Sequence, residues 1–517
     1  MKWTRLAGAA GAALGAVTAY DLTQRSHALL RNFPVIGHGR YLLEKVGPEL
    51  RQYIVTSNQE ERPFSRDQRA WIYTSAKGLD SSFGFGTDID VEHTQGLSFI
   101  KHRTFADGPP ARADEAASLP SAKVLGGPRA RAKAFRPASA VNISGMSFGA
   151  LSDAAASALN RAAAAAGCLH NTGEGGLAAC HRNGGELVFQ VGSGYFGCRA
   201  ADGSFDLGAL KELVASAPVR AIEIKLSQGA KPGLGGRLPA AKVTAQIAQI
   251  RGVPMGQDCE SPGRHTAFGD VDSMLDFVEL LAAETGLPVG IKSAVGELGF
   301  WQELAQAMAG GDRGVDFITV DGGEGGTGAA PLLFADAVSL PFRLGFSRVY
   351  GAFAELELTD QLTFIGSGKL GLPQNAAVAF ALGADMVNVG REALLSIGCI
   401  QSQRCHTGKC PVGVATQDPR LARGIDVPDK TRRAASYLIA LRRELIRVAG
   451  AVGIAHPALL TPRDIEISMA DYASRTLGEI YGYREGWGEL GHELTGELLA
   501  TLAGSTTTRG HGRTRSA

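Results

Sequence analysis

The sequence predicts an α/β protein built on a (β/α)8 TIM barrel, with a helical extension before the barrel and helices after it. From about residue 140, short apolar runs alternate with longer stretches that have the composition of helices. Short runs of this kind, several of them β-branched, are typical of parallel strands buried on both faces. Eight strand–helix units favour a closed barrel over an open doubly wound sheet, which usually has fewer strands and one dominant Gly-rich turn. The predicted strands cover residues 140–146, 168–171, 187–191, 221–226, 289–294, 316–320, 362–365 and 386–389.

Polar and Gly-rich clusters follow nearly every one of these runs, and randomly placed glycines would not favour one end of the strands. In a barrel, the carboxyl ends of the strands share one face, and active sites of this fold are built there. The sequence therefore predicts a ligand site on that face. The clusters cover residues 144–147, 171–174, 225–228, 292–293, 321–323, 366–368 and 390–391.

The segments around the strands predict the remaining organisation. Ser152 is a suitable N-cap for an Ala-rich helix over residues 153–166, and Gly167 is a suitable stop. Residues 433–450 have an amphipathic helical pattern. We expect an apolar segment at 1–25, an extension packed on the barrel at 26–135, the barrel at 136–432, a helical segment at 433–503 and a disordered tail at 504–517.

The N-terminal run at residues 6–20 is apolar and follows two basic residues, Lys2 and Arg5. A bilayer-spanning helix needs about 20 apolar residues, so this run is short and weakly hydrophobic for that role. A signal peptide ending at small residues and a small-residue helix packed on protein are the other two interpretations. The expected localisation is cytoplasmic, with attachment to the inner face of the membrane through residues 6–20 left open.

The composition excludes several classes of protein. Lys and Arg total 52 and Asp and Glu total 51, a formal charge of +1, whereas nucleic-acid binders usually have a basic surplus. The hydrophobic fraction is 44%, which excludes wholesale disorder. The 68 glycines point to tight turns or close backbone approaches to a ligand. Seven cysteines in a chain of 517 residues do not form the disulfide framework of a small secreted domain.

Three Gly-rich loops predict a nucleotide cofactor such as FMN. The sequences GGEGGTGAAP (322–331), FIGSGKLG (364–371) and VNVGREAL follow the last three predicted strands. Loops after strands seven and eight of a barrel commonly bind phosphate, although glycines that only make turns are the alternative. Lys292 is expected beside the electron-rich edge of the flavin. The predicted cofactor-binding residues are Ser144, Met146, Ser147, Lys292, Asp321, Gly323, Gly326, Gly366, Ser367, Gly368, Gly390 and Arg391.

A cysteine motif predicts an iron–sulfur site. Cys399, Cys405 and Cys410 follow one another as Cys-x5-Cys-x4-Cys and precede a proline, as in ferredoxin-type cluster loops. The spacing is wider than the paired knuckles of structural zinc. Three thiolates favour a 3Fe–4S cluster. The alternatives are His406 as a fourth ligand and three buried cysteines without a metal.

Charged residues near the strand ends are the candidate substrate and catalytic groups. Lys231 and Arg237 lie in a Gly-rich loop, and Arg251 follows it; such cations suit a dicarboxylate, although a solvated basic loop is the alternative. Glu174 is the carboxylate within a Gly-rich strand end and is a candidate for holding an amine or moving a proton. The predicted catalytic residues are Glu174 and Lys231. An internal ion pair is the alternative for Glu174 and for Lys292.

Five motifs resemble the FMN-binding synthase domain of glutamate synthase: SGMSFGALS, NTGEGG, QGAKPGLGGRLP, DGGEGGTGAAP and GCIQSQRCHTGKCPVGVATQ. They occur in order, and the resemblance covers most of the chain. It implies FMN, a 3Fe–4S cluster on Cys399, Cys405 and Cys410, and 2-oxoglutarate as substrate. It also implies that Glu174 lies next to the flavin and that Lys231 and Arg251 bind the substrate.

The sequence departs from the family pattern in three places. Arg237 stands where the family has Gln, and the segment CESPGRHTAFGD differs enough to question a role for His265. No cysteine precedes Cys168, so the glutaminase domain with its nucleophilic cysteine is not expected. The chain resembles stand-alone synthase-domain proteins that cannot release ammonia from glutamine.

The expected function is reduction of 2-iminoglutarate, formed from 2-oxoglutarate and ammonia, to L-glutamate by an oxidoreductase of the CH–NH2 class. Electrons would come from ferredoxin or from an NAD(P)H-oxidising reductase subunit, and a homo-oligomer is left open. A related synthase acting on another amine, as in N-methylglutamate synthesis, is the first alternative. An electron-transfer subunit without its own turnover is the second, and a non-flavin barrel aldolase is a distant third.

Overall fold

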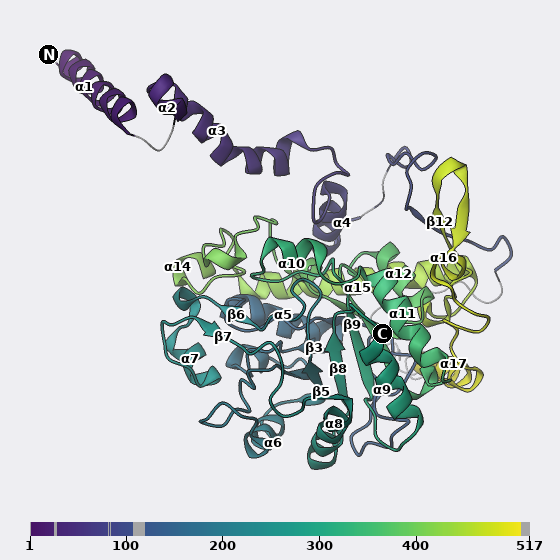
Figure 1. Ribbon diagram of the computed structural model, residues 1–517. Coiled ribbons are helices and arrows are strands. Elements are labelled where there is room, and N and C mark those ends of the chain that lie inside the picture. The colour runs from purple at the N-terminus through teal and green to yellow at the C-terminus, as the bar shows by residue number, and fades with distance from the viewer. Residues whose placement is uncertain (1, 25–27, 81, 83, 107–118, 508–517) are drawn as a thin grey trace, which may run out of the picture. The chain divides into compact units, whose positions relative to one another are not determined.

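The computed structural model describes residues 2–24, 28–80, 82, 84–106 and 119–507 of the chain. Residue contacts divide it into two compact units, residues 1–70 and 71–517, which are described separately (Figure 1). The helix α4 (Arg66–Ala76) crosses this boundary. The predicted boundaries at residues 25, 135 and 432 stay predictions.

The first unit is helical. The predicted apolar run at 6–20 lies within its first helix, and the buried carboxylate of Asp21 accepts hydrogen bonds from Val35 N at 2.8 Å and contacts His38 Nε2 at 2.9 Å. None of the helices in the described ranges combines the length and the apolarity needed to cross a bilayer. The elements are α1 (Lys2–Thr23), α2 (Ala28–Asn32), α3 (Gly37–Leu50) and the π-helical turn η1 (Arg51–Val55).

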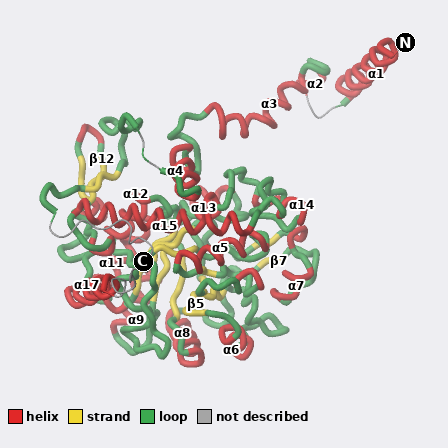
Figure 2. The backbone as a smooth tube through the Cα atoms, turned by 180° about the vertical axis from the view of Figure 1, so that it is seen from behind, coloured by secondary structure: helices red, strands yellow, loops and turns green. Residues whose placement is uncertain are grey.

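The described part of the second unit contains a closed barrel of eight parallel strands, which follow one another around the ring in chain order. The last strand pairs with the first, Val387 with Val141 and Val389 with Ile143, which closes the ring. Figure 2 shows the strands at the centre with helices around them. All eight predicted strands are confirmed. They are β2 (Val141–Ile143), β3 (His170–Asn171), β4 (Leu187–Val191), β5 (Val219–Lys225), β8 (Val289–Ser293), β9 (Phe317–Asp321), β10 (Thr363–Ser367) and β11 (Met386–Val389).

The helices of the second unit pack on the barrel and on one another. The long helix α15 packs along α5, and its buried residues Leu438, Leu441 and Leu445 recur at the spacing of one helical face. The helices are α5 (Asp153–Ala166), α6 (Leu207–Ala215), α7 (Ala245–Arg251), α8 (Val271–Thr285), α9 (Gly299–Ala309), α10 (Leu332–Ala337), α11 (Phe342–Ala354), α12 (Pro373–Ala381), α13 (Arg391–Ser396), α14 (Pro419–Ala422), α15 (Val427–Val452), α16 (Leu477–Tyr481) and α17 (His492–Thr507). The 3-10 turns are η3 (Ala179–His181), η4 (Ala240–Lys242), η5 (Thr359–Gln361), η6 (Cys405–Thr407), η7 (Pro457–Leu459) and η8 (Ala470–Tyr472).

The helix α5 has the predicted bounds and the predicted caps. Ser152 Oγ accepts a hydrogen bond from Ala155 N at 3.2 Å, and Gly167 adopts the left-handed conformation with φ of 63°. Gly fits there because a Cβ would be strained at positive φ.

A Ser152→Ala substitution is expected to destabilise the protein by about 1 kcal/mol, because it leaves an amide of the first turn of α5 without its acceptor. Urea unfolding monitored by circular dichroism measures the change. Ser157→Ala is the matched control, since the Ser157 hydroxyl lies within the same helix and makes no side-chain hydrogen bond to the described residues. Equal losses from the two substitutions would contradict the capping role.

The segment before the first strand closes the amino face of the barrel. Leu125 pairs with Phe135, and Leu119 pairs with Ser139. The buried Lys123 Nζ lies 3.0 Å from Asp385 Oδ2 and donates to the carbonyl oxygens of Thr359 and Leu362. Both β10 and β11 begin next to these partners, so Lys123 fastens this segment to the amino ends of two strands.

Two small sheets lie outside the barrel. The antiparallel pair β6 (Arg237–Leu238) and β7 (Cys259–Glu260) belongs to the excursion between β5 and β8. The strands β1 (Ser98–Ile100), β12 (Ile465–Ser468) and β13 (Ser474–Thr476) form the other sheet.

The part of the chain after residue 432 therefore differs from the purely helical segment expected there. Strands β12 and β13 interrupt it because they pair with each other, and β12 pairs with β1 from far upstream. The helix α17 runs to Thr507 and so includes residues 504–507 of the predicted tail. The rest of the predicted tail, 508–517, lies outside the described residues.

Candidate active site

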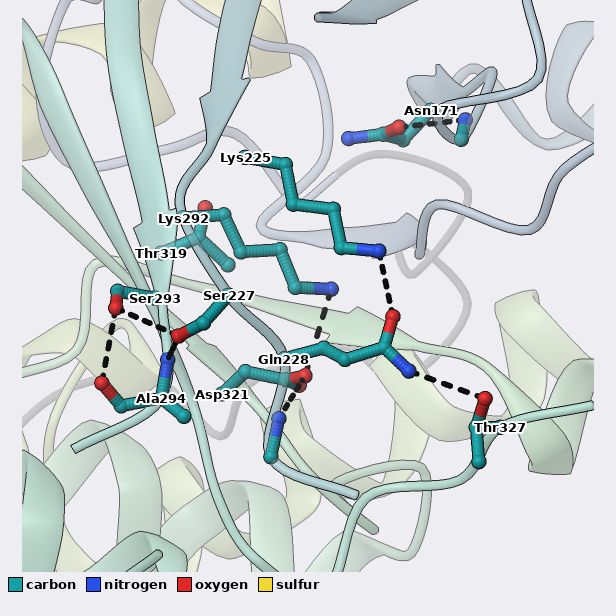
Figure 3. A network of polar contacts seen from close by, with 12 residues as sticks. Asn171, Lys225, Ser227, Gln228, Lys292, Ser293, Ala294, Thr319, Asp321 and Thr327 are labelled. Atoms are coloured by element: carbon teal, nitrogen blue, oxygen red, sulfur yellow. Dashed lines mark hydrogen bonds and ion pairs between the residues drawn. The ribbon is translucent and has the colours of Figure 1, made fainter. Parts of the chain in front are cut away.

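Two lysines end adjacent strands at the carboxyl face of the barrel. Lys225 ends β5 and Lys292 lies near the end of β8, and the two are paired in register. Each amine faces a carboxylate. Lys225 Nζ lies 2.6 Å from Glu174 Oε1, and Lys292 Nζ lies 3.7 Å from Asp321 Oδ2, a pair that is drawn in Figure 3. All four side chains are at most 15% exposed. The face therefore holds two shielded cation–anion pairs.

Glu174 follows β3 and is packed tightly. A Cβ added at Gly192 would lie 2.7 Å from Glu174 Cβ, so a side chain at that position would displace the carboxylate. Burial raises the pKa of Glu174, but Lys225, with Lys231 and Arg251, outweighs burial and lowers the pKa below its ordinary value. Glu174 is therefore an ionised carboxylate at neutral pH, able to bind a cation or accept a proton.

A chain of side-chain hydrogen bonds extends from this pair across the face. Lys225 Nζ also donates to Gln228 Oε1 at 2.5 Å, and Gln228 Nε2 donates to Thr327 Oγ1 at 3.0 Å. Figure 3 shows Gln228 between the lysine and the threonine. The loops after β3, β5 and β9 are thereby joined by one polar chain.

Asp321 ends β9 and fixes the loop after β5. Its Oδ2 accepts a hydrogen bond from Gly229 N at 2.9 Å, in addition to facing Lys292. On the other side of the same loop, the hydroxyls of Ser227 and Ser293 are 2.9 Å apart. These contacts hold the start of the loop that carries Lys231.

A buried carboxylate inside the barrel supports the face from below. Glu223 is 1% exposed, and its two oxygens accept hydrogen bonds from Gln190 (2.6 Å), Asn171 (2.7 Å) and Thr319 (2.7 Å). Asn171 in turn accepts a hydrogen bond from Gly173 N at 2.9 Å. Glu223 therefore positions the loop that carries Glu174 by way of Asn171.

The three predicted substrate cations occupy different environments. Lys231 is buried, and its Nζ donates to the Gly235 carbonyl at 2.9 Å. Burial lowers the pKa of Lys231 by more than the charge of Glu174 raises it, so the pKa is below its ordinary value. Arg251 is buried, donates to the Phe148 carbonyl at 3.0 Å and lies over the Phe196 ring. Both act electrostatically on Glu174, so the structure brings these two to the same region as the predicted catalytic carboxylate.

Arg237 is not part of this cluster. It lies on β6, its side chain is 59% exposed, and it pairs with Asp258 at 3.1 Å and with Glu260 at 3.3 Å. The pairing of β6 with β7 sets Arg237 opposite Glu260. Two acidic partners near the surface account for its charge.

The predicted cofactor residues lie on loops that touch one another around the carboxyl face. Gly322 N donates to Ser367 O at 2.8 Å, and a Cβ on Gly368, whose φ of 124° favours glycine, would lie only 3.1 Å from Gly322 N. Arg391 donates to the Glu324 carbonyl and packs against Gly326. The loops after β9, β10 and β11, which contain Gly323, Gly326, Gly366, Ser367, Gly368, Gly390 and Arg391, are thus brought together.

The loop after β2 completes this ring of loops. Ser144 is buried, and Ser144 N donates to Val389 O at 2.9 Å beside Gly390. Met146 and Ser147 lie against Gly173, where a Cβ would approach their backbone to 2.5–2.9 Å. Gly173, with φ of 67°, is therefore needed for this approach.

The three motif cysteines lie in one loop after α13. Lys242 Nζ donates to the Cys405 carbonyl at 2.8 Å, and the thiols of Cys405 and Cys410 both act electrostatically on that amine. Cys399 Sγ accepts a hydrogen bond from Gln401 N at 3.5 Å. Within the described ranges, however, no three His, Cys, Asp or Glu side chains are arranged to hold a metal ion. The loop supplies the ligand type but does not gather the sulfurs.

Sequence reasoning placed Lys225 and Gln228 in a strand-end cluster at 225–228 but assigned them no role, and it did not single out Glu223. The signal for Lys225 was its position, since it ends β5 and is paired in register with Lys292, one residue before the end of β8. His265, which the sequence left in question, is buried and contacts the Lys225 carbonyl at 2.9 Å through Nε2. Burial lowers the pKa of His265, so it is a neutral support for Lys225.

Comparisons with known proteins find one family and several relatives that are similar to this chain. The family described as the conserved region in glutamate synthase matches residues 122–455. A glutamate synthase large subunit-like protein, YerD of Bacillus subtilis (strain 168), is 38% identical over 468 residues, which cover 84% of this chain and 89% of the relative.

Two further similarities are more partial. An archaeal-type glutamate synthase (NADPH) of Thermotoga sp. (strain RQ2) is 35% identical over 345 residues, which cover 65% of this chain and 64% of the relative, slightly under two thirds of its length. A solved mandelate oxidase variant with an FMN adduct superposes with a TM-score of 0.43 and 15% identity, covering 84% of this chain and 99% of that one.

Proposed function

Because the chain belongs to the glutamate synthase family, whose conserved region spans residues 122–455, we propose that it is an FMN- and iron–sulfur-dependent oxidoreductase. Its reaction would be the reduction of 2-iminoglutarate, formed from 2-oxoglutarate and ammonia, to L-glutamate. The observation that supports this best is the cluster of Glu174, Lys225 and Lys231 beside Lys292 and Asp321 at the carboxyl face of the barrel. A dianionic substrate with a protonated imine needs both cations and a carboxylate within one shielded site.

The residues at the carboxyl face fit FMN. A Cβ built on Gly390 would meet only Ser144 Cβ, at 3.7 Å, so the backbone there leaves space for a ligand. The guanidinium of Arg391 is next to it and suits a phosphate. Gly366, Ser367, Gly368, Gly390 and Arg391 would hold the phosphate, and Ser144, Met146, Ser147, Lys292 and Asp321 would hold the ring. When bound, FMN supplies the hydride chemistry that no side chain offers.

The chain's own residues would bind the substrate and handle its protons. Lys231 and Arg251 would face the two carboxylates of the substrate. Both lower the pKa of Glu174 through their charge, which supports placing them in the same site as Glu174. Glu174, ionised beside Lys225, would hold the iminium nitrogen by a charge-assisted hydrogen bond. The hydrogen-bond chain from Lys225 through Gln228 to Thr327 would keep the amine of Lys225 in place while the proton moves.

The test is anaerobic absorbance of the full-length protein after photoreduction of its flavin. Addition of 2-oxoglutarate and ammonium together is expected to return the oxidised flavin bands, whereas neither compound alone should. Methylamine in place of ammonium tests the alternative function, a related synthase that acts on another amine. A flavin that stays reduced with both amines would refute the synthase function, and a protein that retains no flavin would refute the cofactor.

The same proposal assigns an iron–sulfur cluster to Cys399, Cys405 and Cys410, supported by three thiols in one loop and by Lys242 beside two of them. A cluster of this kind would pass electrons from a ferredoxin or from a reductase subunit. Because the sulfurs are not gathered in the structure, binding of iron and sulfide would have to draw the loop together, and we derive no step through it.

A Cys405→Ser substitution is expected to remove most of the iron from anaerobically reconstituted protein, because three thiolates leave no spare ligand. Iron and sulfide analysis with electron paramagnetic resonance measures the loss. Cys180→Ser is the matched control, since Cys180 is buried in an apolar cluster outside the loop. Iron content unaffected by Cys405→Ser, or equally lowered by both changes, would contradict the assignment.

A further inference from the structure

A cavity of about 440 Å³ lies outside the active site. Its walls come from the residues after β1, from the turn after α15 and from the segment that leads into β12. None of these belongs to a loop that follows a barrel strand. The cavity is therefore separate from the site built by Glu174, Lys225 and the Gly-rich loops, and the proposed function makes no use of it.

The backbone around this cavity is held on two sides. Lys101 N donates to Asp464 O at 2.8 Å, which continues the pairing of β1 with β12, and Arg103 N donates to Ala451 O at 2.9 Å at the end of α15. The stretch 101–103 is thus fixed between a strand and a helix end. The backbone that carries the lining side chains of this stretch is therefore held in place by hydrogen bonds within the protein.

The cavity is lined by more basic than acidic groups. Lys101, His102, Arg103 and Arg463 line it, and Asp464 is its only acidic lining residue among the described residues. The carboxylate of Asp464 accepts hydrogen bonds from the amide and the hydroxyl of Thr461, at 2.8 and 2.9 Å, so it is already engaged.

The ion pairs around the cavity compensate Lys101 and Arg463 and leave Arg103 without an ion pair among the described residues. Lys101 pairs with Glu466 at 3.2 Å, and Arg463 pairs with Glu489, but neither glutamate lines the cavity. The side chains of His102 and Arg103 make no hydrogen bond or ion pair with the described residues. The carboxyl end of α15 has a partial negative charge near Arg103, but its carbonyl groups accept no hydrogen bond from the Arg103 guanidinium in the described residues.

We propose that this cavity binds a phosphorylated small molecule. A guanidinium presents donors in a fork that matches phosphate oxygens, and Arg103 has its fork unused. Ile454 and Leu459 give the cavity an apolar wall for the rest of the ligand. The volume lies within the range of small-molecule sites and far above that of a single ion.

The experiment is calorimetric titration of the FMN-saturated full-length protein with AMP and with inorganic phosphate, so that the proposed flavin phosphate site is filled. The wild type is expected to bind AMP, and Arg103→Met is expected to weaken binding about tenfold through loss of a charged hydrogen bond. Arg447→Met is the matched control on α15, because Arg447 pairs with Glu444 and does not line the cavity. It should leave the affinity unchanged.

Three results would overturn the proposal: no binding of either probe, the same affinity in Arg103→Met as in the wild type, or succinate competing with AMP at equal affinity. The last would assign the cavity to carboxylates. Thermal unfolding verifies that the Arg103 variant is folded. If it is not, Arg463→Met carries the same test, since Arg463 is 66% exposed and its removal leaves no buried gap.

Discussion

A Lys225→Met substitution is expected to lower the rate of flavin reoxidation by 2-oxoglutarate and ammonium about a hundredfold or more, the range in which positioned acid–base groups contribute. Lys225 Nζ is the nearest cation to Glu174, at 2.6 Å, and it is 10% exposed. Without it, the carboxylate that we assign to the iminium nitrogen loses both its partner and its orientation. Stopped-flow absorbance of the photoreduced enzyme measures the rate.

The pH profile of the same variant separates a chemical role from a structural one. Lys225 is the largest of the charges that hold the pKa of Glu174 down against burial. Its loss should raise that pKa, so the rate should begin to rise with pH at a higher pH than in the wild type. Lys225→Arg keeps the charge and is expected to restore part of the rate. Lys211→Met is the control, since Lys211 is an exposed ion-pair residue on α6. A Lys225→Met enzyme with the wild-type rate and pH profile would refute the proposed role of Lys225.

A Lys123→Met substitution is expected to destabilise the fold by about 3–5 kcal/mol, the usual effect of removing one partner of a buried ion pair. Lys123 and Asp385 are 7% and 4% exposed, and the lysine also serves two carbonyl oxygens next to β10. The substitution leaves Asp385 charged, buried and without its cation. Urea unfolding followed by circular dichroism measures the difference, and Lys211→Met should change stability by less than about 1 kcal/mol.

The pH dependence of this loss has a defined sign. Burial raises the pKa of Asp385 by more than Lys123 lowers it, so the pKa is above its ordinary value. The folded protein therefore binds a proton at Asp385 more tightly than the unfolded chain does. Removing Lys123 should raise the pKa further. Stability should then increase as pH falls through the raised pKa, and the deficit of the variant should shrink on acidification from neutral pH. A deficit that stays constant or grows on acidification would contradict the uncompensated charge on Asp385.

The barrel was predictable because its signals are local. Each buried parallel strand is a short apolar run, and the caps of α5, Ser152 and Gly167, lie beside the helix they delimit. Strands β12 and β13 were missed because they are stabilised by pairing with each other and because β12 pairs with β1, more than 360 residues earlier. No local pattern contains that pairing.

The candidate site shows the same division. The strand-end motifs located Glu174, Lys292 and Asp321 correctly on one face, because the fold itself gathers strand ends. They did not reveal that Arg237 is paired with Asp258 and Glu260, since that depends on the β6–β7 pairing. They also passed over Glu223, whose role depends on three donors from three other strands.

The fastening of residues 119–139 at the amino ends of the strands has an evolutionary consequence. Lys123 and its partners contribute stability at one end of the barrel, whereas the residues assigned to chemistry occupy loops at the other end. Loops after the strands can therefore accept new side chains without weakening this anchor, which leaves a reserve of stability for mutations that alter specificity. A mutant library confined to the non-glycine positions of residues 172–176 and 226–238 should yield many folded variants, and selection on a different amine or keto acid could then act on chemistry alone.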